Sequence, residues 1–124
     1  IMVSGSKIPK IKITSSLKEA SSKITKFKLG LAIIMKKNLV AGILTDGDAR
    51  RSLRYNFKSQ NLKKIMTSNP VFISENSTAS KALAIMNKKK ITSLLVTSET
   101  GLKSKNKKLI GIVHIHSILQ FGIK

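Results

Sequence analysis

The chain has 124 residues, of which 41% are hydrophobic, enough for one compact domain or two small, mutually dependent ones. No apolar run approaches the roughly 20 residues of a membrane span, no secretory signal is visible, and zero cysteines exclude a disulfide framework and fit a reducing cytoplasm. The net charge of +19 comes almost entirely from lysine, and aromatic residues make up only 4%. Because single-strand binders stack bases on aromatic side chains, a solvated lysine-rich surface is favoured over a nucleic-acid interface.

The first half of the chain predicts the order strand, helix, strand, strand, helix. Residues 1–9 carry the breakers Gly5 and Pro9 and are expected to be irregular, and residues 11–13 alternate like a short strand. Ser16 and Glu19 form a capping-box pattern, followed by apolar residues at helical spacing as far as Phe27. Two apolar strands are expected at residues 31–35 and 39–44, and a helix is expected after Asp48, to about residue 55.

The second half predicts a similar order after a polar connector at residues 56–62. Residues 71–73 form a short strand, and Ser77 is the expected cap of a helix with apolar positions up to Met86. The remaining elements are an apolar strand at 93–97, a long polar loop at 98–107, a strand at 109–113 and a terminal helix at 116–121.

The second half therefore repeats the first. Pro9 corresponds to Pro70 and Gly42 to Gly111, and the loop at 98–107 absorbs the difference in length. The pattern predicts a mixed α/β (α+β) fold of two β-α-β-β-α modules, residues 1–58 and 59–124, packed about a pseudo-twofold axis. Clefts are expected where equivalent strand-to-helix turns approach one another.

One of these turns gathers short polar side chains where a buried strand gives way to a helix. Backbone N–H groups are free at such a place, so the turn is suited to a small ligand. The alternative is that an aspartate caps the helix and an arginine closes a local ion pair. Gly47 is expected to permit the turn or a close approach of ligand. The residues concerned are Thr45, Asp46, Gly47, Asp48, Arg50 and Arg51.

Two such modules, each with a Gly-apolar-apolar-polar strand end before the last helix, resemble a tandem CBS-domain pair. More narrowly, the chain resembles the C-terminal region of bacterial arabinose-5-phosphate isomerases. Ser117 stands where that family usually has an acidic residue. The matching segments are residues 2–9, 45–51, 65–70, 91–96 and 111–116.

The resemblance implies that Thr45 and Asp48 hold a nucleotide. A carboxylate accepts hydrogen bonds from two vicinal ribose hydroxyls, and a threonine hydroxyl contacts a phosphate. Since aspartates repel a phosphate, the phosphate is expected nearer Arg50, Arg51 or a lysine than Asp46.

The resemblance also implies that the chain, which begins inside a pattern, is the regulatory part of a longer enzyme. The isomerase chemistry, between D-ribulose 5-phosphate and D-arabinose 5-phosphate, is attributed to an upstream sugar-isomerase domain. That pathway leads to 3-deoxy-D-manno-octulosonate (Kdo) for lipopolysaccharide or capsule, so the activated sugar CMP-Kdo is the expected effector and an adenine nucleotide the generic alternative. The chain is expected to form a homo-oligomer. It is expected to need no cofactor and not to associate with a membrane.

In the second module, His114 occupies the position equivalent to Thr45. His114 and His116 lie two residues apart and are expected on one side if the strand persists, for ligand or inter-repeat contact or for structural hydrogen bonding. A metal is disfavoured because no third ligand is near. Thr92 and Ser93 line the same cleft in one interpretation and cap a strand edge in the other.

No nucleophile–base pair is present, so this chain by itself is not expected to be an enzyme. The rival functions are a basic nucleic-acid-binding domain and a purely structural dimerisation module with an empty cleft.

Overall fold

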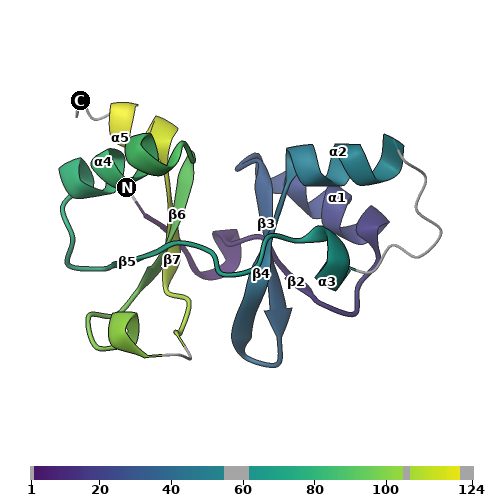
Figure 1. Ribbon diagram of the computed structural model, residues 1–124, viewed down its shortest axis with the longest axis horizontal. Helices are drawn as coiled ribbons and strands as arrows, with labels where there is room; N and C mark the ends of the chain where they lie inside the picture. The colour runs from purple at the N-terminus through teal and green to yellow at the C-terminus, as the bar shows by residue number, and fades with distance from the viewer. Residues whose placement is uncertain (1, 55–61, 105–106, 121–124) are drawn as a thin grey trace. The chain divides into compact units, whose positions relative to one another are not determined.

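The computed structural model describes residues 2–54, 62–104 and 107–120, and the chain forms two compact units (Figure 1). The N-unit comprises Ser6–Pro70, and the C-unit comprises Val71–Lys124 together with Ile1–Gly5. The module boundary expected between residues 58 and 59 lies outside the described residues.

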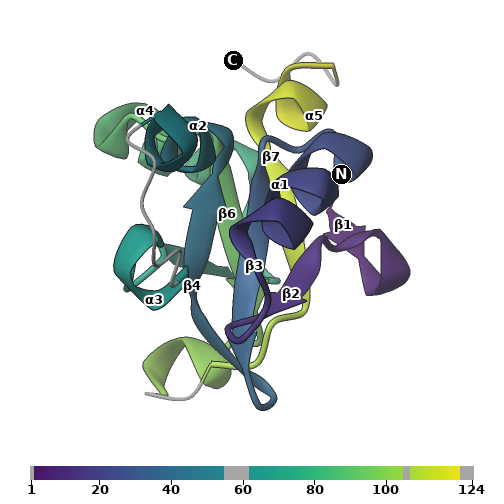
Figure 2. The same ribbon diagram turned by 90° about the vertical axis from the view of Figure 1, so that its right-hand side faces the viewer.

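The N-unit contains a three-stranded sheet in the order β2-β3-β4, visible in Figure 2. The short β2 strand runs parallel to β3, and β3 is antiparallel to β4. Helices cover one face of this sheet, and Leu17, Ile24, Ile34, Leu44 and Leu62 form much of the core between them. The elements are β2 (Lys10–Lys12), α1 (Leu17–Phe27), β3 (Leu31–Lys36), β4 (Leu39–Thr45), α2 (Asp46–Arg54) and α3 (Leu62–Ile65).

The C-unit repeats this order and adds one strand, giving a four-stranded sheet β1-β7-β6-β5. Strand β5 is parallel to β6, whereas β7 is antiparallel to both β6 and β1. Its core includes Ile73, Met86, Leu94, Val96 and Ile118. The elements are β1 (Val3–Ser4), β5 (Phe72–Ser74), α4 (Ala79–Lys89), β6 (Ser93–Thr97), β7 (Gly111–His114) and α5 (Ile115–Gln120), with a 3-10 turn at Gly101–Lys103. Another 3-10 turn, Gly5–Lys7, spans the boundary between the two units.

The predicted mixed α/β fold with two β-α-β-β-α units is confirmed, and the corrections are local. The cap of α4 is Thr78, not Ser77: Thr78 Oγ1 accepts a hydrogen bond from the Lys81 N–H at 3.1 Å. Ser and Thr are both good caps, so composition does not distinguish neighbouring positions. Helix α2 begins at Asp46, two residues before the expected start, and the short helix α3 was not expected.

The segment at the start of each sequence repeat belongs to the unit formed by the other repeat. Val3 pairs with Ile112 of β7 in the C-unit, and Thr67 exchanges backbone hydrogen bonds with Ile43 of β4 in the N-unit, at 3.0 and 2.8 Å. The expectation that residues 1–9 are irregular is therefore wrong for β1.

Glycines permit these close approaches. A Cβ on Gly42 would lie 2.6 Å from the Thr67 carbonyl oxygen, and a Cβ on Gly111 would lie 2.6 Å from the Val3 carbonyl oxygen. Both distances are too short for real atoms, so each strand needs glycine where the foreign segment crosses it.

Among the described residues, no helix combines the length and apolar composition needed to cross a membrane.

Candidate functional site

The turn between β4 and α2 is closed by two reciprocal hydrogen bonds. The Asp48 N–H donates to Thr45 Oγ1 at 3.1 Å, and the Thr45 N–H donates to Asp48 Oδ2, also at 3.1 Å. This is the geometry of a capping box, with Thr45 as cap and Asp48 three residues later. It starts the helix directly after Thr45 and fixes the orientation of the Asp48 carboxylate.

Two arginines pair with the two aspartates of this turn. Arg51 Nη2 donates to Asp48 Oδ1 at 2.6 Å, and the Asp48 side chain is only 15% exposed. Arg50 lies 3.3 Å from Asp46, but both of these side chains are more than half exposed, so this second pair contributes little to stability. The local ion pair of the alternative interpretation is therefore present. The helix cap is present too, but the capping residue is Thr45 and not an aspartate, with Asp48 as its capping-box partner.

The turn retains hydrogen-bonding capacity for a ligand. An ionised carboxylate has about four acceptor positions, and within the described residues Asp48 uses one on each oxygen. Thr45 Oγ1 acts here as an acceptor, so its hydroxyl proton is free to be donated. The geometry thus offers a fixed acceptor, a hydroxyl donor and two exposed guanidinium groups within one turn.

Gly47 does not serve the conformation of the turn. Among the described glycines, only Gly5 and Gly30 have positive φ, whereas Gly47 is helical. The expectation that Gly47 permits the turn is wrong. The alternative, that glycine at position 47 allows a ligand to approach closely, stays a prediction.

Gly47→Ala is expected to raise the free energy of unfolding by about 0.5–1 kcal/mol, because alanine loses less conformational entropy than glycine in a helix. The added Cβ would lie 3.4 Å from Arg51 Nη1, the end of a flexible side chain. Urea denaturation measures the change. A loss of stability would contradict the prediction and show that a Cβ at position 47 clashes with its neighbours.

The second candidate group lies at one end of β6 and β7 in the C-unit. Ser93 pairs with His114, and the Thr92 carbonyl accepts a hydrogen bond from the Ile115 N–H at 2.8 Å. The rings of His114 and His116 stack with centroids 4.8 Å apart, and the His116 N–H donates to His114 Nδ1 at 3.2 Å. The structure therefore brings these four predicted residues together.

The two histidines lie on one side for a different reason from strand alternation. Strand β7 ends at His114, so the strand period does not align the two rings; the turn into α5 does. His114 caps α5 as Thr45 caps α2, but Ser117 provides no carboxylate at the third position. Ser93 Oγ is buried and has no hydrogen-bond partner within the described residues, which leaves one polar group available to a ligand.

The pKa of His114 is lowered from its ordinary value of 6.5, mainly by burial and secondly by the charge of His116. A pKa below the unfolded value means that the unfolded chain binds more protons, so this histidine stabilises the fold above about pH 6.5 and loses that contribution as pH falls through the lowered pKa. Protonation of Nδ1 would also remove the acceptor for the His116 N–H.

We therefore expect the free energy of unfolding to fall as the pH drops from about 6.5 through the lowered pKa of His114, and His114→Gln to flatten this dependence. His116→Gln should flatten it only in part, because the burial of His114 remains. Urea denaturation at a series of pH values measures the effect. Equal slopes for the parent and His114→Gln would contradict it.

Within the described residues, no group of three or more His, Cys, Asp and Glu side chains is arranged to hold a metal ion.

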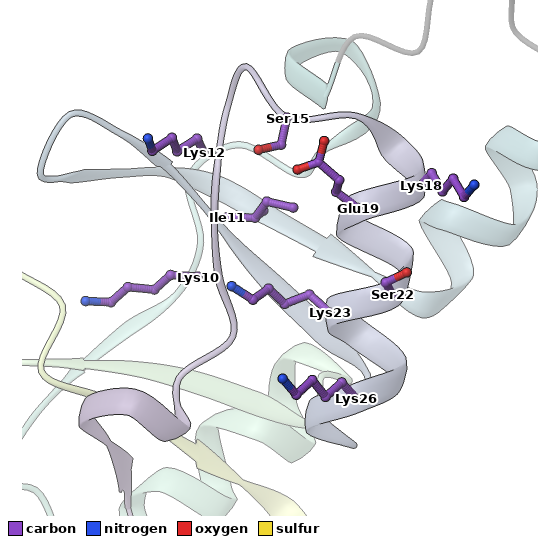
Figure 3. A pocket seen from close by; sticks show the side chains of 9 residues that line it. All are labelled: Lys10, Ile11, Lys12, Ser15, Lys18, Glu19, Ser22, Lys23 and Lys26. Carbon is purple, nitrogen blue, oxygen red and sulfur yellow. The ribbon is translucent and has the colours of Figure 1, made fainter.

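The sequence interpretation missed a groove between β2 and α1, lined by five lysines (Figure 3). These lysines were attributed to a general solvated surface because they are separated in sequence. The only available signal was that Lys10 and Lys12 alternate with buried Ile11 just before a lysine-rich helix.

Comparison with known proteins identifies a family and several related sequences. The family model described as CBS domain matches residues 62–124. The arabinose 5-phosphate isomerases KdsD of Escherichia coli (strain K12) and Yersinia pestis are 31% and 34% identical, over 99% of this chain in each case. The chain spans only 36% of the length of these two relatives.

Solved structures share the fold. The CBS domain pair of protein MJ0100, in complex with 5′-methylthioadenosine and S-adenosyl-L-methionine, has a TM-score of 0.80 at 20% identity, covering 97% of this chain and 91% of that one. CBSX2 in complex with AMP has a TM-score of 0.77 at 17% identity, covering 98% of this chain and 91% of that one. At these identities the likeness concerns the fold.

Proposed function

Since this chain belongs to the CBS domain family, we propose that it is the regulatory CBS pair of an arabinose-5-phosphate isomerase and binds a nucleotide-type effector. The observation that carries the proposal is the match to the isomerases along 99% of this chain but only 36% of theirs. Catalysis then resides in the remaining part of the parent protein, the sugar-isomerase domain. The two modules, residues 1–58 and 59–124, sense the effector in the cytoplasm and link copies of the enzyme into a homo-oligomer.

The chemistry of the Thr45 turn supports a ribonucleoside. The two free acceptor positions of Asp48 suit the vicinal hydroxyls of a ribose, and Thr45 with Arg50 and Arg51 suits a phosphate. Because Ser117 provides no carboxylate, the ribose is placed at the first module. Thr92, Ser93, His114 and His116 then form the corresponding polar turn of the second module.

The effector is accordingly a 5′-substituted ribonucleoside. The adenosine compounds bound by MJ0100 and CBSX2 support an adenine nucleotide. The resemblance to the isomerases supports CMP-Kdo, an end product of the pathway that leads to lipopolysaccharide or capsule. Both molecules carry the ribose diol that Asp48 would bind.

Isothermal titration calorimetry of the 124-residue chain with AMP, CMP and CMP-Kdo tests this proposal. A 2′-deoxy analogue of the nucleotide that binds is the matched control, and it should bind at least about tenfold more weakly because one hydrogen bond to a charged group is lost. Equal binding of the ribo and deoxy forms would exclude Asp48 as the diol acceptor.

Two other results would each favour a different function. No heat with any nucleotide would favour a purely structural dimerisation module. Turnover of D-arabinose 5-phosphate by this chain alone would overturn the regulatory assignment.

A further inference from the structure

The groove between β2 and α1 of the N-unit has a volume of about 660 Å³. Figure 3 shows that Lys23 and Lys26 extend from α1 toward β2. Lys18 points away from β2, and Lys10 and Lys12 extend from β2 to the side away from α1. The groove is lined by Lys10, Ile11, Lys12, Ser15, Lys18, Glu19, Ser22, Lys23 and Lys26.

The groove concentrates uncompensated positive charge. Within the described part of the chain, none of its five lysines forms an ion pair, and all except the half-buried Lys23 are exposed. Lys23 Nζ lies 5.9 Å from the centroid of the Phe27 ring. The single carboxylate, Glu19, accepts a hydrogen bond from Ser16 Oγ at 3.3 Å as part of the helix cap.

The C-unit provides an internal comparison, because α1 and α4 have equal length and equivalent caps. Likewise Ile11 of β2 and Ile73 of β5 pair with equivalent residues, Ile34 and Val96. On this alignment four of the groove lysines are replaced and only Lys26 has a lysine counterpart, Lys88. The residues at the positions of Lys10, Lys12, Lys18 and Lys23 are Phe72, Ser74, Ser80 and Ile85.

The fold therefore does not require lysine at these positions, since the same elements form in the C-unit without them. If lysines were simply spread over the whole surface, they would also occupy the equivalent positions on β5 and α4 of the C-unit. At four of the five aligned positions lysine occurs in the N-unit only. A ligand of opposite charge would reduce the mutual repulsion of these ammonium groups.

We propose that this groove binds a small molecule carrying two or more phosphate groups, at a site separate from the Thr45 turn. Its volume falls within the range of about 300–1,000 Å³ typical of small-molecule sites. Ammonium groups donate charge-assisted hydrogen bonds to phosphate oxygens, and the Ser15 and Ser22 hydroxyls are neutral donors beside them. The lining has no aromatic residue on which nucleic-acid bases would stack, which favours a small polyphosphate over single-stranded nucleic acid.

The test uses inorganic tripolyphosphate as the probe, titrated calorimetrically into the 124-residue chain at about 0.15 M salt. The groove variant carries Lys10→Gln, Lys23→Gln and Lys26→Gln. The matched control carries Lys36→Gln, Lys81→Gln and Lys88→Gln, which removes the same charge from exposed positions outside the groove. Circular dichroism confirms folding of both. If the groove triple variant does not fold, Lys23→Gln with Lys26→Gln replaces it, and Lys36→Gln with Lys81→Gln becomes the control.

The groove variant is expected to bind tripolyphosphate at least about tenfold more weakly and the control less than about threefold, because only close charge pairs keep their strength in salt. Glu19→Gln should instead strengthen binding, since it removes the only negative charge in the groove. Equal weakening of both triple variants, or no binding by the parent chain, would overturn the proposal.

Two further measurements separate this proposal from its rivals. Tighter binding of a single-stranded oligonucleotide than of tripolyphosphate, lost in the groove variant, would make the groove a nucleic-acid interface and overturn the small-molecule assignment. Asp48→Ala should leave tripolyphosphate binding intact, and the groove variant should leave nucleotide-monophosphate binding intact. Failure of one site is therefore distinguishable from failure of the other.

Discussion

Asp48→Ala is expected to abolish the thermal stabilisation that a nucleotide effector confers on this chain. A ligand at 100 times its dissociation constant stabilises a folded protein by about 2.7 kcal/mol, which corresponds to a rise in melting temperature of about 10 °C for a domain of this size. Without the Asp48 carboxylate, the ribose loses its acceptor and this shift should vanish. Differential scanning fluorimetry with the nucleotide identified by calorimetry measures it.

The same substitution also removes one of the two capping-box hydrogen bonds, the one that the Thr45 N–H donates to Asp48 Oδ2, so a matched capping-box residue is needed as the control. Glu19 occupies the equivalent capping-box position of α1, where the Glu19 N–H donates to the Ser16 side chain at 3.1 Å. The control variant is therefore Glu19→Ala. Asp48→Ala and Glu19→Ala should each lose about 1 kcal/mol of unfolding free energy in the absence of ligand. Only Asp48→Ala should lose the ligand-induced shift, and loss of the shift in both variants would show that capping alone supports binding.

Gly111→Ala is expected to destabilise the C-unit by about 1–3 kcal/mol, the usual cost of overpacking a well-packed site. Its Cβ would overlap the Met2 side chain and lie 2.6 Å from the Val3 carbonyl oxygen. The Met2 side chain can move, but the Val3 carbonyl is part of β1, so relief requires β1 to separate from β7. Urea denaturation gives the loss of stability.

Two comparisons make this prediction specific. Gly47→Ala, whose Cβ would make only ordinary van der Waals contacts with the Arg51 and Thr45 side chains, should change stability in the opposite direction. Combining Gly111→Ala with Met2→Ala should recover only part of the loss, because the backbone contact with Val3 remains. Full recovery would show that the side chain of Met2, and not the pairing of β1, demands glycine at this position.

Most of the fold was predictable because its signals are local. The Ser16–Glu19 pattern placed the start of α1, and the apolar runs placed β3, β4 and β6 to within a residue or two. The errors occurred where local chemistry is degenerate. Ser77 and Thr78 are equally suitable caps, and Asp46 and Asp48 are equally suitable first-turn residues until hydrogen bonds show which one is paired with Thr45.

Part of the candidate site was likewise predictable from the sequence and part was not. The sequence was enough to predict a helix cap and a local ion pair at the turn after β4, because both join near neighbours. It did not identify Thr45 as the cap or its reciprocal hydrogen bonds with Asp48. His114 and His116 were expected to point to one side if the strand persisted; they do lie together, but because of the turn into α5. Its geometry depends on where β7 stops, which in turn depends on pairing with β6.

By itself the sequence determined the order of the elements, the repeat and the polar turn after β4, since these depend on side-chain period and on hydrogen bonds between near neighbours. Only the tertiary structure decided that Val3 pairs with Ile112, that glycine is needed at position 111, and that lysines of β2 and α1 line one groove. Pairing between distant segments is a competition among many similar apolar strands, and it is settled by which arrangement buries both units' cores.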